Sequence, residues 1–471
     1  MLRGKFGRLG GWVTITAGAL FALVGAACDS GSGDETTTAT GSSSGGPSSD
    51  VTFHKDIEPI LHKTCLGCHR VDQIAGFSLE SYEDAKAMSG LMAAQVEARL
   101  MPPFHAADTD QCKPTHGFLD DPRLSDDEVA LFRAWDDAGA PEGDPADAPP
   151  AYVPEDQQLP DTDLEMTPAS GETVDGDDDI FQCVVYDPAL TEDKWLDGIN
   201  IVPGNRKVAH HALLFRVSRA DAAAASGGQE RFDCFGAPGA DLIGAWAPGA
   251  KPLELPTDVG MQLTTDDVIV VQMHYHPTGD TSEVDKSSIQ LRYIDATPKW
   301  SFQFALLGNA SSASEGLLAD PDDRGEPEFR IPAGAKSHTE DMEFTIPETG
   351  IEVPVLLVGT HMHYVGYDGR FSVTRANPGP SELADECFVE TPAWDFNWQR
   401  GYMYDAPISD LPTISTGDVV HMHCEYNNTM GNRFVQQALE QQGLSAPQDV
   451  SLGETTLDEM CLGVLGYLLP N

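Results

Sequence analysis

Eight of the 14 histidines form four close pairs along the chain: His210/His211, His274/His276, His361/His363 and His421/His423. Residues two apart on a strand project from the same face, so His361 and His363 can converge on one ion. The adjacent His210 and His211 can share an ion only where a strand ends, bulges or twists. Clustered imidazoles indicate metal binding, and a fold that uses them must bring distant segments together.

The segments around these pairs are predicted to be β-strands. Val268–Met273, Val355–Val358 and Val419–Met422 are short, largely apolar runs with Gly, Asp or Pro nearby. Such runs are typical of strands buried in a sandwich.

The first residues have the features of an export signal. Residues 1–27 combine a basic start with an apolar stretch that is short for a membrane span. Cys28 follows Gly25-Ala26-Ala27, which resembles a bacterial lipobox, although a larger aliphatic residue is usual at the position of Gly25. We expect an exported bacterial protein of the periplasm or cell envelope, either lipidated at Cys28 or cleaved near Ala27. Residues 28–50 are expected to be a flexible Gly/Ser/Thr linker.

The charge balance excludes two classes of partner. The chain has 28 Lys and Arg against 75 Asp and Glu, a formal net charge of -47. Such a surface repels nucleic acid and anionic lipid headgroups. Membrane association is therefore expected only through a lipid at Cys28.

The sequence Cys65-Leu66-Gly67-Cys68-His69 is the attachment signature of a c-type haem. The two thiols would form thioethers with the haem, and His69 would be an axial ligand of the iron. The alternatives are a disulfide or a zinc knuckle, and zinc would require a second ligand pair that this helical region lacks.

Residues 51–145 resemble a class I cytochrome c domain. The resemblance rests on a leading helical pattern, the CxxCH motif, Met101 in a Met-Pro-Pro loop, and a helix that opens with a capping box at Ser125. Met101 is the expected sixth haem ligand, and Met88, Met92 and His105 are its rivals. Residues 146–165 are an acidic, Pro-rich linker.

Four ordered motifs carry a second resemblance, over about residues 160–470: Val208–Phe215, Val271–Tyr275, Gly359–His363 and Asp458–Cys461. They are similar to motifs of the copper type II, ascorbate-dependent monooxygenases. The resemblance implies that His210, His211 and His274 bind an electron-storing copper. It implies likewise that His361, His363 and Met460 bind the copper that activates O2. Gln272 matches a family position near the first copper, with a structural polar residue as the alternative.

The fold class expected from both resemblances is a small all-α cytochrome c domain followed by two antiparallel, jelly-roll-like β-sandwich copper domains, residues 166–298 and 299–471. The family pattern also suggests the disulfides Cys183–Cys234 and Cys424–Cys461. Cys112 and Cys387 are left to pair with each other or to leave a free thiol.

The function implied is hydroxylation of a C–H bond of a small organic molecule with O2. Electrons would come from a donor through the haem, from ascorbate, or from both. Gly359, Leu462 and Val464 replace polar residues that bind substrate in the peptide-hydroxylating family members, so we expect a small apolar or aromatic substrate. The alternative is a non-catalytic haem–copper electron carrier or metal-binding protein. His276, His421 and His423 match no ligand of the family.

Overall fold

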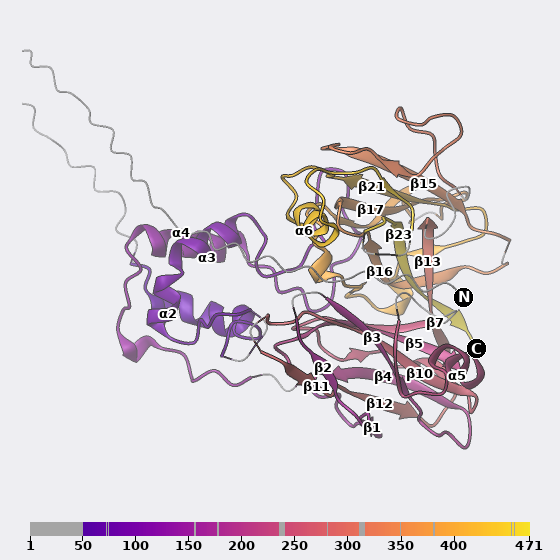
Figure 1. The fold of residues 1–471 in the computed structure, drawn as a ribbon, viewed down its shortest axis with the longest axis horizontal. Helices are drawn as coiled ribbons and strands as arrows, with labels where there is room; N and C mark the ends of the chain where they lie inside the picture. Colours follow the sequence, from indigo (N-terminus) through magenta and orange to yellow (C-terminus); the bar gives the residue numbers. More distant parts are fainter. Residues whose placement is uncertain are drawn as a thin grey trace, which may run out of the picture. The chain divides into compact units, whose positions relative to one another are not determined.

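The computed structural model describes residues 50–471 except 72, 74, 155–156, 177–178, 235–240, 280, 310–315, 349, 380–381, 454 and 456. The predicted signal peptide, most of the first linker and Cys28 lie outside the described residues. The described chain is mainly β, with short helices gathered before residue 140 (Figure 1).

The helices before residue 140 are η1 (Phe53–Ile57), α1 (Glu58–Ile60), η2 (Leu61–Cys65), α2 (Tyr82–Ala87), α3 (Ser89–Glu97) and α4 (Asp126–Asp137). The capping box predicted at Ser125 is confirmed, because its side chain accepts from Glu128 N–H and the Glu128 carboxylate accepts from Ser125 N–H. Phe53, Phe132 and Trp135 are buried together in a small core of this region.

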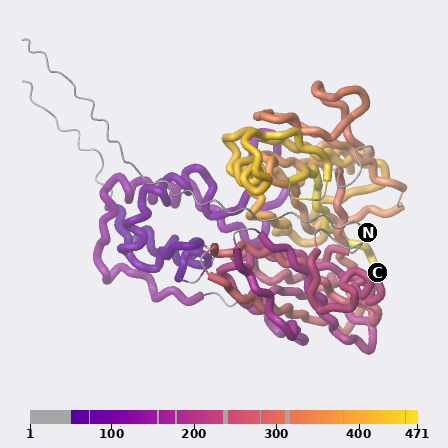
Figure 2. Tube along the Cα trace, in the orientation of Figure 1, coloured from indigo at the N-terminus to yellow at the C-terminus, as the bar shows by residue number. Residues whose placement is uncertain are grey.

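The fold class predicted from the sequence was wrong, because the described residues contain no separate all-α domain before the strands. After α3 the chain is extended, and Phe104 and Phe118 belong to the same hydrophobic core as the strands. Phe118 forms a β-bridge with Tyr404. The helical pattern and the CxxCH motif did not reveal this extended segment, since its apolar partners lie near the other end of the chain (Figure 2).

The largest sheet contains, in spatial order, β1 (Leu164–Met166), β12 (Ser288–Ile294), β4 (Lys194–Val202), β9 (Val259–Leu263), β13 (Trp300–Asn309), β23 (Cys461–Pro470), β16 (Val353–His361) and β19 (Tyr402–Met403), with β8 (Leu253–Glu254) beside β4 and β20 (Thr413–Ile414) beside β16. Most of its pairs are antiparallel, but β9 and β13 pair in parallel. This pairing joins strands from both predicted copper domains into one sheet.

Two further sheets pack on it. The first contains β6 (Arg231–Asp233), β3 (Ile180–Tyr186), β10 (Asp267–Tyr275), β5 (Ala209–Ser218) and β7 (Asp241–Trp246). The second contains β15 (His338–Thr345), β21 (Val419–Tyr426), β17 (Gly366–Thr374) and β18 (Asp385–Thr391). Buried side chains of all three sheets share one core, for example Ile199 from β4, Val271 from β10 and Phe371 from β17.

The remaining elements are small. Two ribbons pair β2 (Glu172–Val174) with β11 (Glu283–Asp285) and β14 (Arg330–Ile331) with β22 (Val450–Ser451). Helices α5 (Arg219–Ser226) and α6 (Arg433–Gln442) and the 3₁₀ turns η3 (Pro145–Asp147), η4 (Phe396–Trp398) and η5 (Ile408–Asp410) complete the described elements. None of the helices in this described part is long and apolar enough to cross a membrane.

Strand β10 shows why the predicted apolar runs form strands. Ile269 and Val271 face the main core, whereas Val268 and Val270 pack with Phe215 in a second cluster on the other face of the sheet. Because both faces of β10 are covered, its sequence is continuously apolar rather than alternating. The strand predictions for Val268–Met273, Val355–Val358 and Val419–Met422 are confirmed.

Three disulfides link distant parts of the chain. The predicted pairs Cys183–Cys234 and Cys424–Cys461 are confirmed, and Cys112 pairs with Cys387, which the sequence left open. Three disulfides indicate an oxidising, extracellular-type environment. Cys112–Cys387 joins the extended segment after α3 to strand β18.

Replacing Cys112 and Cys387 together by serine should lower the free energy of unfolding by about 2–4 kcal/mol, because the bond closes a very long loop. Chemical denaturation measures this loss, and limited proteolysis should cut the segment between Phe104 and Phe118 first. Unchanged stability together with an unchanged cleavage pattern would contradict the role given to this disulfide.

Candidate functional site

The first histidine cluster lies where β5 and β10 pair. His274 stands opposite His211, and the register then shifts so that Tyr275 pairs with Ala209. The shift leaves His210 as the extra residue of a β-bulge. The irregularity that the adjacent histidines require is therefore present, and it lets both rings face one point.

The three imidazoles converge through the same ring nitrogen. Nδ1 of His211 lies 3.2 Å from Nδ1 of His210 and 3.1 Å from Nδ1 of His274. Nitrogens that bind one tetrahedral metal at about 2.0 Å stand about 3.3 Å apart. The spacing of these three atoms is therefore that of a three-histidine metal site.

Burial keeps the rings of His210 and His211 neutral. Burial, reinforced by the neighbouring His274, lowers the pKa of His210 to about 3. The same two causes lower the pKa of His211 well below its usual range. A neutral imidazole offers the lone pair that a metal requires, so no proton must leave before the metal binds.

Asp179, which directly precedes β3, contacts two histidines of this region. Its carboxylate lies 3.0 Å from Nε2 of His274 and 2.7 Å from Nδ1 of His276. Burial alone would raise the pKa of Asp179, but the contacts with the two histidines outweigh it and lower that pKa. An ionised carboxylate on the far nitrogen of a ligating histidine fixes the ring and raises its basicity.

The second histidine pair presents the opposite ring nitrogen. Nδ1 of His361 lies 2.8 Å from Oε1 of Gln399, and Nδ1 of His363 lies 3.1 Å from the carbonyl oxygen of Asp458. Since these oxygens only accept, both Nδ1 atoms carry the proton and both Nε2 atoms carry the lone pair. Burial is the main cause that lowers the pKa of His361 to about 3 and that of His363 to about 4.

The pairing of β16 with β23 places Met460 near His361 and His363. His361 pairs with Leu462 at the start of β23, so the same register brings His363 alongside Met460. The buried Glu459 accepts a hydrogen bond from His363 N–H, and the Tyr426 hydroxyl donates to the Met460 carbonyl oxygen over 2.9 Å. The Cys424–Cys461 disulfide fixes the next residue. Met460 is itself buried, so little freedom remains at this position.

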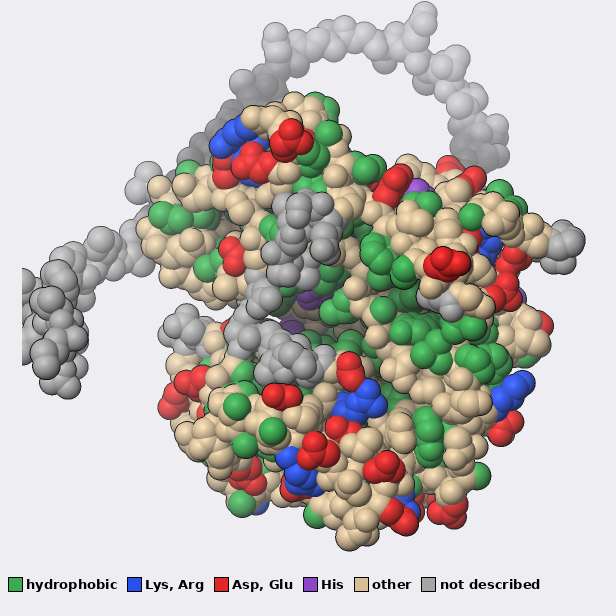
Figure 3. Space-filling model, turned by 90° about the vertical axis from the view of Figure 1, so that its right-hand side faces the viewer, with side chains coloured by type: hydrophobic (Ala, Val, Ile, Leu, Met, Phe, Trp, Pro, Cys, Tyr) green, Lys and Arg blue, Asp and Glu red, His purple; other side chains and the backbone are tan. Residues whose placement is uncertain are grey.

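Phe396 is close to both histidine groups. Its ring centroid is 6.3 Å from that of His211 and 6.2 Å from that of His363. The two candidate centres are therefore neighbours. The space-filling view shows histidine side chains within a hollow of this surface (Figure 3).

The CxxCH motif forms a single turn after η2. The N–H groups of Cys68 and His69 both donate to the Cys65 carbonyl oxygen, over 3.1 and 3.0 Å. Cys65 and Cys68 are free thiols. Nδ1 of His69 is buried without a hydrogen-bond partner, and its ring lies 4.5 Å from that of Phe77. The disulfide alternative is therefore absent here, and the donor set remains suited to covalent haem.

Cys68 also lies close to the strands. It lines a small cavity together with Arg206, Trp246 and Gly249. Trp246 ends β7 and pairs with Ala212, the residue after His211. The motif thus lies against the sheet that carries the first histidine cluster.

Other predicted residues lie apart from these groups or in their surroundings. Met101 lies in the turn after α3, where its N–H donates to the Gln95 carbonyl oxygen, and its role as sixth haem ligand stays a prediction. His421 and His423 project from the outward side of β21 toward Glu343 and Asp341. Gln272 is buried two residues before His274, with its amide 4.0 Å from Cys234 Sγ.

Several residues of the site were missed from the sequence. Asp179 and Gln399 belong to no motif, and Glu459 lies in the Asp458–Cys461 motif without a role assigned from the sequence; only the structure shows which histidine each one meets. A separate cluster of Asp320, His338 and Glu340 was also missed, although its ligand atoms lie within 4.8 Å of one another. The i, i+2 spacing of His338 and Glu340 on a strand was the signal available.

Comparison with known proteins assigns no family. No protein-family model and no curated protein matches the sequence. A crystal structure of the infectious bursal disease virus VP2 subviral particle aligns at 8% identity and TM-score 0.15, over 68% of this chain and 74% of that chain. The structure of the Gx strain of this virus aligns at 8% identity and TM-score 0.08, over 67% and 84%.

Replacing Asp179 by asparagine should weaken copper binding at the His210/His211/His274 cluster about 10- to 100-fold, because an amide neither orients nor polarises His274 as a carboxylate does. Competition titration with a chromophoric Cu(I) chelator measures this affinity. The exposed Asp175→Asn variant is the control for a lost charge nearby and should bind as the unchanged protein does. Equal affinities in all three proteins would show that Asp179 does not support the cluster.

Proposed function

We propose that this chain is a copper-dependent monooxygenase that uses O2 to hydroxylate a C–H bond of a small organic substrate. The observation that carries the proposal is the convergence of three Nδ1 atoms close to a second histidine pair whose Nδ1 atoms face oxygen acceptors. Two neighbouring sites with different donor sets suit a reaction that needs two electrons delivered singly. The proposed likeness is to the copper type II, ascorbate-dependent monooxygenases.

In this proposal the first copper is held by Nδ1 of His210, His211 and His274. Three imidazoles suit copper in both of its common oxidation states. The Asp179 carboxylate lies 3.0 Å from Nε2 of His274, and burial keeps His210 and His211 neutral. The second copper is held by Nε2 of His361 and His363 with the Met460 thioether, a soft ligand that favours Cu(I). Bound copper would supply the one-electron chemistry and the activation of O2.

The residues beside the second pair support an apolar substrate. Leu462 pairs with His361 and is buried, and Val464 pairs with Gly359. A side chain at position 359 would begin 3.2 Å from the Arg400 carbonyl oxygen. Gly359 carries no carboxylate-binding side chain like that of the peptide-hydroxylating members, so we propose a small apolar or aromatic compound with an activated C–H bond.

We propose that Cys65, Cys68 and His69 hold a covalent c-type haem, with Met101 as sixth ligand. Burial raises the pKa of the Cys65 thiol to about 11. The haem would accept electrons from a donor, in place of or beside ascorbate. For the location we propose the bacterial periplasm or cell envelope, with lipidation at Cys28.

A Cys65→Ala/Cys68→Ala variant should be exported without covalent haem yet keep both coppers, because the thioethers need these two thiols and the histidine ligands do not. The pyridine haemochrome spectrum and the metal content of protein matured in the periplasm measure the two results. The Cys112→Ser/Cys387→Ser variant is the control for lost cysteines and should keep its haem. Wild-type protein without haem under these conditions would refute the assignment.

A Met460→Ala variant should lose turnover by at least about 100-fold, because the O2-activating copper would lose its soft ligand. The assay is O2 uptake with ascorbate and a set of small aromatic compounds that have a benzylic C–H bond. Copper X-ray absorption of the Cu(I) protein gives a readout without substrate, since the sulfur contribution should disappear.

The buried neighbour Met362 provides the matched control. A Met362→Leu exchange conserves volume in the core and should keep both turnover and the sulfur signal. A Met460→Ala protein that still hydroxylates, or a wild type without a copper–sulfur contribution, would contradict the enzyme assignment. A non-catalytic haem–copper carrier would instead show reduction of the three-histidine copper and no substrate-dependent O2 uptake in any variant.

A further inference from the structure

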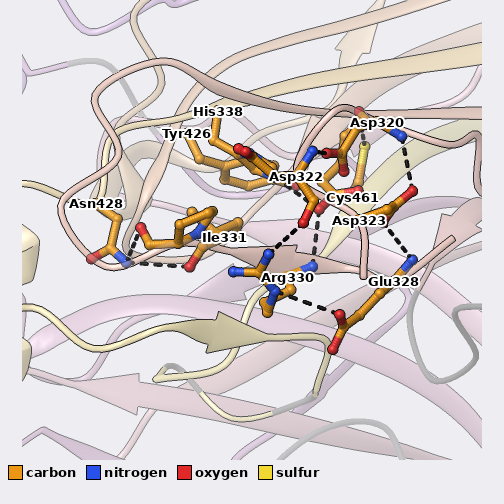
Figure 4. A network of polar contacts seen from close by, with 12 residues as sticks. Asp320, Asp322, Asp323, Glu328, Arg330, Ile331, His338, Tyr426, Asn428 and Cys461 are labelled. Atoms are coloured by element: carbon orange, nitrogen blue, oxygen red, sulfur yellow. Dashed lines mark hydrogen bonds and ion pairs between the residues drawn. The ribbon is translucent and has the colours of Figure 1, made fainter. Parts of the chain in front are cut away.

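A second cluster of candidate metal ligands lies on β15 and the segment before it. Asp320, His338 and Glu340 each offer one ligand atom, and these atoms lie within 4.8 Å of one another. His338 and Glu340 project from the same face of β15, because they are two residues apart on the strand. Figure 4 shows His338 with Asp320 and Asp322 in the network of polar contacts around Arg330.

Backbone pairing brings Asp320 to this strand. Leu317 forms an antiparallel bridge with Met342, and Leu318 N–H donates to the Asp341 carbonyl oxygen over 2.9 Å. Continuing this register places residue 320 beside His338 and Glu340. The Asp320 backbone N–H donates to Asp323, and its carboxylate accepts from Asp322 N–H, so the segment is held in a defined turn.

Glu340 is the residue that most needs a further partner. Its side chain is 0% exposed, and its Oε2 atom has no hydrogen-bond partner. Its Oε1 atom accepts from Arg330 N–H and lies 2.9 Å from Nε2 of His338. A buried carboxylate oxygen without a partner is costly and typically indicates a cation or water at that position.

Charge in the cluster also favours a cation. Three carboxylates, from Asp320, Asp322 and Glu340, surround the one imidazole of His338, and Nδ1 of that ring lies 3.4 Å from Asp322 Oδ2. His338 and Glu340 are buried, whereas the Asp322 side chain is 59% exposed. Three carboxylates thus face one imidazole.

We propose that Asp320, His338 and Glu340 bind a divalent transition-metal ion of the Zn²⁺ type. One imidazole and two carboxylates are a usual donor set for Zn²⁺, whereas Ca²⁺ and Mg²⁺ prefer oxygen alone. The absence of a sulfur donor separates this site from the His361/His363/Met460 group, and it goes beyond the proposed copper chemistry.

The position of the site indicates its role. Glu340 pairs with Cys424, and its carbonyl oxygen lies 3.9 Å from Cys461 Sγ. His338 pairs with Tyr426, whose hydroxyl binds the Met460 carbonyl oxygen. A metal here would link the segment around Asp320 to β15. This strand pairs with β21 at Cys424, whose disulfide partner Cys461 directly follows Met460. We assign it a structural function.

The test uses the full exported chain, with its histidine sites loaded with copper, dialysed against ZnCl₂ and analysed for metal content. Wild-type protein should retain one Zn²⁺ that Asp320→Asn and His338→Gln bind at least about tenfold more weakly. Zinc X-ray absorption of the wild type should show nitrogen and oxygen ligands without sulfur. Zn²⁺ should also raise the Tm of the wild type but not that of the variants.

The control is His421→Gln, which removes a histidine that faces the single carboxylate of Glu343 from the neighbouring strand. This variant should retain the Zn²⁺.

The proposal is overturned if copper-loaded wild-type protein binds no zinc, or if Asp320→Asn and His338→Gln retain as much zinc as the wild type. The cluster is then an imidazolium that binds carboxylates. Asp320 is only partly buried and lies outside the strands, so Asp320→Asn tests the site with little risk to folding. Copper content is measured in the same samples, so loss of zinc and failure of the copper assignment are separate results.

Discussion

The antiparallel pairing of β10 with β5 is the contact on which the rest of the site depends. Strand β10 is covered on both faces, and each fully buried aliphatic side chain contributes about 1.5–3 kcal/mol. A slip of one residue would exchange the side chains that pack in the two cores, so close packing on both faces specifies the register. The same register places His274 opposite His211, and the bulge then adds His210. Hydrophobic packing therefore sets the geometry of the histidine cluster before any metal binds.

The two histidine groups differ in which ring nitrogen is available, and this difference comes from their hydrogen-bond partners. At the first group the Nδ1 atoms face one another, and the Asp179 carboxylate lies 3.0 Å from Nε2 of His274. At the second group, Gln399 and Asp458 occupy the Nδ1 atoms. Burial lowers the pKa of His210, His211, His361 and His363, so these four rings are neutral at pH 7. One residue type thus provides two different donor sets, and only the second group has a thioether beside it.

The ligand candidates could be found from the sequence, but their surroundings could not. Spacing along a strand identified His361 and His363, and the two disulfides suggested by the family pattern are present. Asp179 and Gln399 carry no local signal, because their role arises only from strand register and loop placement. The prediction of a separate all-α domain was wrong for a related reason. The helices near the CxxCH motif were visible in the sequence, whereas the partners of Phe104 and Phe118 lie among strands near the other end of the chain.

That error changes how the CxxCH motif relates to the rest of the chain. A domain on a flexible linker would sample many positions relative to the sheets. Here the segment after α3 is part of the strand core and is covalently bonded to β18 through Cys112–Cys387. Cys68 lies against Trp246, and Trp246 is paired with the residue after His211. A prosthetic group on Cys65 and Cys68 would therefore keep a fixed position beside the three-histidine cluster. Fixed placement favours the first cluster over the second as the partner of that group, since β7 pairs with β5 and not with β16.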